Sequence, residues 1–226
     1  METTGTNPRA GFFGQLTPQD RDAIRSHSGS RRFTAGSTLM YEGQAGAEVL
    51  ILVSGRVKVS YLTRDGREVI LDFRGPGELI GEMAVVDGHP RSNTVQAIEP
   101  VHVLALPASD FRALVASSPT LANQLLQNMI RRFRDSDRKV IEFGASHTVG
   151  RVAARLVEMV ERFGTATAAG HVIDLPITQD ELAGWTGASR EAVAKALASL
   201  RELDLIATDR RRFTVLDLEG LRQRYR

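Results

Sequence analysis

The chain has 226 residues, with 29 lysines and arginines against 27 aspartates and glutamates, and a formal net charge of +2. This length suits one large domain or two small ones, each able to bury a core, and zero cysteines exclude disulfides and cysteine-ligated iron–sulfur clusters. The polar N-terminal residues do not resemble a signal peptide, and no run of roughly eighteen apolar residues suggests a membrane span. We therefore expect a cytoplasmic protein.

The first residues predict one short helix. Residues 1–10 are polar, and we expect no regular structure there. From Phe12 to His27 the apolar positions favour an amphipathic helix, with Thr17 and Pro18 at a cap position.

From Arg32 to about Leu106 the apolar residues alternate, as in strands. Turns are indicated by glycines, most clearly Asp65-Gly66. Many short strands at regular spacing predict an antiparallel barrel or jelly roll that can hold one small ligand. The expected strands are residues 37–41, 49–53, 57–61, 69–73, 94–97 and 101–105.

The stretch from Gly81 to Ser92 carries the chemistry of a nucleotide site. A helical turn beginning near Glu82 would offer free N–H groups to an anion. Arg91 can bind two phosphate oxygens at once, Ser92 adds a hydroxyl donor, and the oxygens of Glu82 suit a ribose hydroxyl. The alternative interpretation is a surface loop with an ordinary Glu82–Arg91 ion pair.

A second group of helices follows Pro107. One helix is expected near Ala108, and a longer one is capped by residues 117–120. The longer one has neither glycine nor proline from Leu121 to Phe143, so it can extend for roughly 35 Å. Its apolar residues recur at steps of three and four, which is typical of a seam that pairs two helices. The seam exceeds the needs of one small barrel and predicts a homodimer; packing on its own barrel is the alternative.

Ser136 and Asp137 interrupt this seam where an apolar side chain is expected. Burying them without partners would cost about 1–3 kcal/mol or more. A ligand is therefore the expected partner, and a solvated pair on a slightly bent helix is the alternative.

The C-terminal part contains a helix-turn-helix pattern. Residues 145–164 form another amphipathic helix, and the small residues 165–170 are expected to be a loop. Thr178 and Glu181 make a capping box, residues 186–188 a turn with glycine, and Ser189 opens the next helix. Leu182, Val193 and Leu197 are expected to face inward.

The second of these helices exposes side chains suited to DNA bases. Arg190 suits guanine O6 and N7, Glu191 a cytosine amine, and Lys195 a guanine or a phosphate. An alternating hairpin from 205 to 216 places Arg210, Arg211 and Arg212 at its tip, suited to a phosphate backbone, and residues 222–226 add positive charge. A solvated charged helix face is the alternative.

From about Gly43 to Leu218 the chain resembles the cyclic-AMP receptor protein/FNR (Crp/Fnr) family of bacterial transcription regulators. The resemblance implies an α+β fold: an N-terminal double-stranded β-helix, or jelly roll, that binds cyclic nucleotides, a long dimerisation helix and a C-terminal winged helix-turn-helix. The expected boundaries are 1–117 for the β-roll domain, 118–144 for the helix and 145–226 for the DNA-binding domain.

The resemblance also implies roles for residues. In the family, the positions of Gly81 and Glu82 bind the sugar, those of Arg91 and Ser92 the phosphate, and a pair on the long helix contacts the base, one residue reaching across from the other subunit. Asp137 differs from the family, which has a hydroxyl or an amide at this position. A carboxylate can accept a hydrogen bond from the adenine amine, and it accepts better from the paired N–H donors of guanine. The alternative interpretation is that the pocket no longer binds a nucleotide. The implied nucleotide ligands are Gly81, Glu82, Met83, Ala84, Arg91, Ser92, Ser136 and Asp137, and the implied DNA contacts are Thr178, Gln179, Ser189, Arg190, Glu191, Lys195 and Arg211.

Together these features predict a cyclic-nucleotide-responsive, sequence-specific transcription regulator and not an enzyme. We expect a homodimer on a pseudo-palindromic operator, with cyclic AMP or cyclic GMP as effector, RNA polymerase as a further partner and no metal or other cofactor. A regulator of the same fold without a nucleotide is the first alternative. The sequence has no recognisable pair of histidine ligands for a haem sensor and no cysteines for the iron–sulfur branch of the family. It also has no P-loop and no nucleophile–base pair that would indicate an enzyme. The operator and the sign of regulation do not follow from the sequence.

Overall fold

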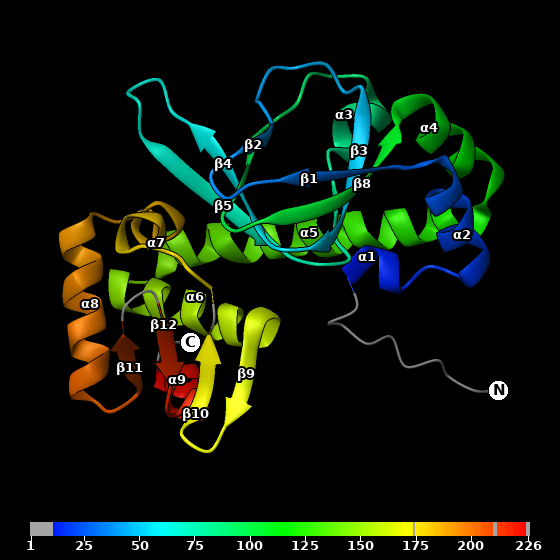
Figure 1. The fold of residues 1–226 in the computed structure, drawn as a ribbon. Helices are drawn as coiled ribbons and strands as arrows, with labels where there is room; N and C mark the ends of the chain where they lie inside the picture. The colour runs from blue at the N-terminus through cyan, green and yellow to red at the C-terminus, as the bar shows by residue number, and fades with distance from the viewer. Residues whose placement is uncertain (1–10, 174, 210–211, 225–226) are drawn as a thin grey trace. The chain divides into compact units, whose positions relative to one another are not determined.

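A computed structural model describes residues 11–173, 175–209 and 212–224, which fall into two compact units (Figure 1). The first unit holds residues up to 61 and 71–134, and the second holds 62–70 and residues from 135 onward. The expectation for residues 1–10 lies outside the described residues. None of the helices described is long and apolar enough to cross a membrane.

The first unit is a jelly roll built from two four-stranded sheets, as expected. One sheet has the order β1-β8-β3-β6 and the other β2-β7-β4-β5. All six expected strands are present, and β1 and β6 are additional. The strands are β1 (Gly29–Phe33), β2 (Thr38–Met40), β3 (Glu48–Ser54), β4 (Val57–Leu62), β5 (Glu68–Arg74), β6 (Leu79–Ile80), β7 (Thr94–Ala97) and β8 (Val101–Pro107).

The sheet that contains β3 is the middle layer of this unit (Figure 1). Val49 and Ile51 pack in a cluster with side chains from the helices, whereas Leu50 and Leu52 pack in the cluster between the two sheets. All four residues are at most 1% exposed. The strand is therefore apolar without alternation because both of its faces are buried.

The helices of the first unit are α1 (Gly11–Gly14), α2 (Pro18–His27), α3 (Glu82–Asp87), α4 (Ala108–Ser117) and the start of α5 (Pro119–Ala145). The single helix expected from Phe12 to His27 is wrong in extent, because the chain makes two helices there. Thr17 is the N-cap of α2 and its Oγ1 accepts from the Asp20 N–H at 3.1 Å. Pro18 has no N–H to continue a helix from the preceding turn, so a new helix starts at this point.

The second unit contains the end of α5 and a winged helix-turn-helix, as the sequence predicts. Its elements are α6 (Thr148–Phe163), β9 (Gly164–Thr167), β10 (Gly170–Ile173), α7 (Gln179–Thr186), α8 (Arg190–Glu202), β11 (Ile206–Asp209), β12 (Arg212–Val215) and α9 (Leu218–Arg224). The loop expected at 165–170 is wrong, since these residues belong to a β9–β10 hairpin whose second strand pairs with β12. This pairing, rather than local propensity, makes the small residues extended.

Asp20 is a buried carboxylate that ties α2 to the start of α5. It accepts from the hydroxyls of Ser118 at 2.6 Å and of Thr120 and Thr17 at 2.7 Å each. Burial raises the pKa of Asp20, but hydrogen bonds from Ser118, Thr17 and Thr120 together bring this pKa below its usual value. The ionised carboxylate therefore stabilises the fold above the unfolded-state pKa of about 3.9, and this stabilisation is lost as the pH falls through the lower folded-state pKa.

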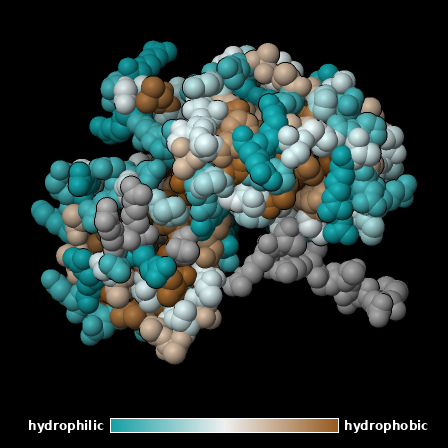
Figure 2. Space-filling model, in the orientation of Figure 1, coloured by the Kyte–Doolittle hydropathy of each residue, from teal (hydrophilic) through white to brown (hydrophobic). Residues whose placement is uncertain are grey.

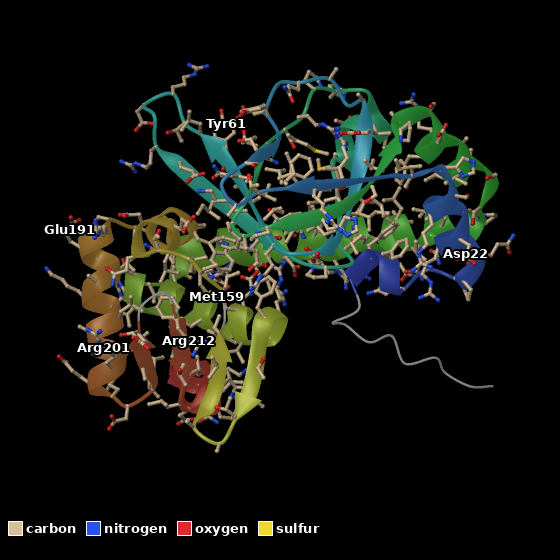
Figure 3. The ribbon with its side chains drawn as sticks, viewed as in Figure 1. Asp22, Tyr61, Met159, Glu191, Arg201 and Arg212 are labelled. Carbon is tan, nitrogen blue, oxygen red and sulfur yellow. The ribbon has the colours of Figure 1, made fainter. Side chains whose placement is uncertain are left out.

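Asp20→Ala should lower the free energy of unfolding of the first unit by about 1–3 kcal/mol at pH 7, because the hydroxyls of Ser118 and Thr120 lose their acceptor. The difference from the parent should shrink below about pH 4. Urea unfolding followed by circular dichroism measures both effects. Asp22→Ala on the same helix, with its side chain 75% exposed (Figure 3), should change stability by less than about 0.5 kcal/mol. Equal effects of the two substitutions would show that the Asp20 network does not stabilise the fold.

Candidate functional site

The stretch from Gly81 to Arg91 folds as a short helix between two glycines. Gly81 has φ 82° and Gly88 φ 75°, and α3 lies between them. A Cβ on Gly81 would stand 2.3 Å from Nη1 of Arg91. Glycine is therefore needed at this position both for its backbone conformation and for the close approach of the guanidinium.

Arg91 is buried, with 7% of its surface exposed. It donates to the carbonyl oxygens of Gly81 and Glu48, and its own backbone N–H donates to the carbonyl of Gln44 at 2.7 Å. Burial lowers the pKa of Arg91, and the charges of Glu48 and Glu82 oppose this change. The guanidinium keeps its positive charge at neutral pH, because arginine side chains are not deprotonated in proteins.

Glu82 is 2% exposed, and its partner is an arginine of α5. Its Oε1 accepts from Nη1 of Arg132, while Nη2 of Arg132 donates to the Leu79 carbonyl. Burial, followed by the charge of Arg74, lowers the pKa of Arg132. The alternative of an exposed Glu82–Arg91 pair is therefore wrong. Both charges are buried and each has its own partners.

Sequence reasoning missed Arg132 as part of this cassette, which we define as Gly81 to Ser92 with the side chains that touch it. The sequence offered one indication. Two consecutive arginines, Arg131 and Arg132, precede Phe133 of the apolar seam, and neighbouring helix positions cannot both face the same partner. Its partner, fifty positions earlier in the chain, could not be identified from spacing.

The other predicted nucleotide ligands are distributed between the two units. Ala84 is buried in α3, whereas Met83 is 48% exposed on its outer side. Ser92 is exposed next to Arg91, and its Oγ accepts from Nδ2 of Asn93 at 2.9 Å. Ser136 and Asp137 are exposed on α5 in the segment that belongs to the second unit, so their contact with a ligand in the cassette stays a prediction.

The helix-turn-helix has the local geometry that the sequence predicts. Oγ1 of Thr178 accepts from the Glu181 N–H at 3.1 Å, and Oε2 of Glu181 accepts from the Thr178 N–H at 2.8 Å. Ser189 caps α8 by accepting from the Ala192 N–H at 3.2 Å, and Gly187 has φ 59°. The expected inward residues are buried; they are Leu182, Val193 and Leu197.

The predicted base-reading side chains are all exposed on this module. Figure 2 shows a mostly hydrophilic outer side of α8, and Figure 3 places Glu191 near its N-terminal end. Nη1 of Arg190 lies 3.6 Å from Oδ2 of Asp180, both side chains about two-thirds exposed, so this pair is weak and leaves the guanidinium accessible. Hydrogen bonds from its own backbone N–H and from Ser189 lower the pKa of Glu191, which keeps it an ionised acceptor. Lys195 is exposed.

The remaining predicted DNA contacts differ in their surroundings. Gln179 is exposed at the start of α7, whereas the Thr178 hydroxyl is engaged in capping. The predicted contact Arg211 lies outside the described residues. Arg222 donates to Oε1 of Glu161 at 2.7 Å, and this bond raises its pKa, so the first arginine of the basic tail is paired within its own unit.

No group of three or more potential metal ligands occurs among the residues whose positions are described.

Comparison with known proteins identifies both parts of the chain. The family described as "Cyclic nucleotide-binding domain" matches residues 30–118, and "Crp-like helix-turn-helix domain" matches residues 150–224. The "CRP-like cAMP-activated global transcriptional regulator" of Mycobacterium tuberculosis is 32% identical over 218 residues, or 96% of this chain and 97% of that protein. The "Cyclic AMP receptor protein" of Thermus thermophilus is 31% identical over 84% of this chain and 85% of that protein.

Solved structures agree with this match. A transcriptional regulator of the CRP family from Thermus thermophilus has a TM-score of 0.72 at 27% identity, covering 85% of this chain and 95% of that chain. FixK2 from Bradyrhizobium japonicum has a TM-score of 0.77 at 21% identity over 87% of this chain and 96% of that chain, which supports the fold alone.

The fold and the two sites define a transcription regulator in which a cyclic nucleotide-binding domain is joined to a helix-turn-helix DNA-binding domain. The chain belongs to the Crp/Fnr family.

The Arg132–Glu82 pair should contribute cooperatively to the stability of the first unit. Arg132→Met and Glu82→Gln should each lower its free energy of unfolding, by up to roughly 3 kcal/mol for the arginine, because that change leaves Glu82 charged and buried. The double variant should lose about 1–3 kcal/mol less than the sum of the two losses, as measured by urea unfolding. Arg134→Met, at an exposed position of the same helix, should change stability by less than about 0.5 kcal/mol. Additive losses would contradict a direct interaction.

Proposed function

We propose that this regulator binds a cyclic nucleotide, cyclic AMP or cyclic GMP, in the cassette and uses it to control operator binding by a homodimer. The observation that carries the proposal is the buried guanidinium of Arg91. Carbonyl oxygens hold it in place, yet they use only two of the five N–H donors that an arginine has. A cyclic phosphate supplies the acceptors and the negative charge that such a group favours.

The sugar and the phosphate have separate partners in this proposal. Arg91 and Ser92 take the phosphate, with the backbone of Gly81, Met83 and Ala84 beside them. Oε1 of Glu82 accepts from Arg132, and we propose that Oε2 accepts from a ribose hydroxyl. The relatives named as activated by cyclic AMP support a cyclic nucleotide as the effector.

Ser136 and Asp137 are proposed to contact the base. Ser136 follows Arg132 by four positions on α5 and so lies on the same helix face, one turn further on. The Asp137 carboxylate can only accept hydrogen bonds, which suits the adenine amine and suits the paired N–H groups of guanine better. The same residue favours the second candidate function, a regulator of this fold that binds no cyclic nucleotide.

The homodimer is proposed to form along α5. Four large apolar side chains recur there at steps of four, three and seven residues, and in the single chain they are exposed: Leu126 57%, Ile130 42%, Phe133 68% and Val140 67%. Such a seam is typical of two helices packed side by side. A dimer would place two recognition helices about 34 Å apart, which suits a pseudo-palindromic operator.

Regulation requires the nucleotide to bind the DNA-competent arrangement more tightly than the other. The protein would act by binding alone, without turning the nucleotide over, in the cytoplasm where its operator lies. RNA polymerase is the expected further partner at the promoter.

Arg91→Ala should abolish binding of cyclic AMP and cyclic GMP in calorimetry, because it removes the phosphate ligand. Arg91→Lys keeps the charge but loses the fork, and should bind at least about tenfold more weakly than the parent. Arg67→Ala, at an exposed position on the β4–β5 hairpin, is the control and should bind as the parent does. Titration of Asp137→Ser in parallel distinguishes the purines, since a guanine preference should shift toward adenine.

Unchanged nucleotide affinity in folded Arg91→Ala would remove the pocket assignment. No binding by the parent itself would favour the second candidate function.

Arg190→Ala should weaken binding to a duplex selected from a random library by about 1–3 kcal/mol and relax the preference at one base position. Binding to unrelated DNA should remain, with its salt dependence almost unchanged, because phosphate contacts supply it. Fluorescence anisotropy at several salt concentrations measures both quantities. Arg201→Ala, near the other end of α8 (Figure 3), is the matched control. An unaltered sequence preference in Arg190→Ala would contradict the base contact.

A further inference from the structure

The end of α5 is built into the helix-turn-helix module through the one tryptophan of the chain. Trp185 lies on α7 and is 3% exposed. Nζ of Lys139 stands 5.6 Å from the centre of its ring, and Cζ of Arg155 stands 5.5 Å from the same point. Lys139 comes from α5 and Arg155 from α6, so three helices meet at this ring.

A chain of ion pairs fixes the two cations. Arg155, whose side chain is 5% exposed, donates to Glu142 of α5 and, at 2.6 Å, to Oε2 of Glu158. Oε1 of Glu158 lies 3.7 Å from Nζ of Lys139 and accepts from Arg162 at 3.0 Å. Removing one member of such a buried pair leaves an uncompensated charge, so the network resists changes in the position of α5.

A second contact joins the last turn of α5 to the end of α7. Arg151 donates through Nε to the Thr186 carbonyl at 2.8 Å and through Nη1 to the Ser146 carbonyl at 2.6 Å. Its guanidinium also stands 5.6 Å from the ring centre of Phe143. A Cβ on Gly187, in the turn before α8, would lie 2.6 Å from that same ring. The turn that aims the recognition helix therefore packs directly on α5.

We propose that Trp185, Lys139 and Arg155 form a joint that sets the orientation of recognition helix α8 relative to the end of α5. They are positioning residues: they do not read DNA, and they act through α7 and the turn. A displacement of α5 at Ser136 and Asp137 would reach α8 through this joint. Each cation–π contact with tryptophan contributes about 0.5–2 kcal/mol, so the loss of one contact should measurably loosen the joint. The regulatory part of this inference rests on the proposed function, whereas the positioning part does not.

The test uses the full-length protein and an operator duplex selected from a random library by the parent. Trp185→Leu keeps the site apolar but removes the ring face, and Lys139→Met removes one cation from α5. Each should weaken operator binding about tenfold or more, while the affinity for unrelated DNA changes less than about twofold, because phosphate contacts persist. With nucleotide present, the ratio of operator affinities with and without it should fall toward one. Calorimetric affinity for cyclic AMP should be unchanged, since the cassette is untouched.

The two substitutions should also be non-additive if they act on one joint, and the double variant should bind the operator about as weakly as Trp185→Leu alone. Leu221→Ala, which removes a buried apolar side chain of α9 in the same unit, is the control for loss of stability. It should lower the melting temperature without changing operator preference or the nucleotide ratio.

Unchanged operator affinity and unchanged nucleotide ratio in Trp185→Leu would overturn the joint, as would equal losses in the Leu221→Ala control. If the parent binds neither cyclic AMP nor cyclic GMP, the proposed effector fails. The loss of operator preference in Trp185→Leu still decides the positioning role in that case.

Discussion

The charged side chains buried beside the sheet of the first unit are paired with other groups of the same chain, and these pairs link its elements. Arg91 is held by two carbonyl oxygens, and Glu82 is held by Arg132 of α5. Each of these charges would be costly without its partner, because water is excluded. The arrangement thereby connects the cassette, the sheet and the long helix. An anion bound in the cassette, as proposed above, would join a set of interactions that already reaches α5 through Arg132.

The long helix has a different environment along its length. Leu121 and Leu125 are buried in the first unit, whereas Phe133 and Val140 are exposed in the single chain. The end of the helix is held by ion pairs and by a tryptophan of the DNA-binding module. The same helix therefore provides part of a domain core, an exposed apolar surface that we propose is covered by a second copy, and contacts to α7 and to the turn before the recognition helix.

In the DNA-binding module the helix starts are capped locally, and the side chains predicted to contact bases are exposed. Thr178 and Glu181 satisfy the first N–H groups of α7, and Ser189 does so for α8. Because the side chains of these three residues cap the helix starts and apolar residues fill the interior, Arg190 and Glu191 make only weak surface contacts. Base recognition can thus vary among members of one fold without disturbing its packing.

The features that the sequence predicted correctly are those that depend on local interactions. The caps at Thr17, Thr178 and Ser189, the turn between α7 and α8 and the apolar run of β3 are each visible in residues within a few positions of one another, and the sequence determined them. The split of the first helix was misjudged because one proline decided it. The β9–β10 hairpin was missed because the small residues of β9 become extended only by pairing with β10, which in turn pairs with the distant strand β12.

Tertiary structure alone decided the partners of the buried charges. The Arg132–Glu82 pair joins residues fifty positions apart. The contact between Arg155 and Trp185 joins two different helices, and no periodic pattern in the sequence relates the two residues. Periodicity and capping report interactions along one element, where geometry is fixed by the backbone. Contacts between elements depend on how sheets and helices pack, and no repeat in the chain encodes which charge will meet which.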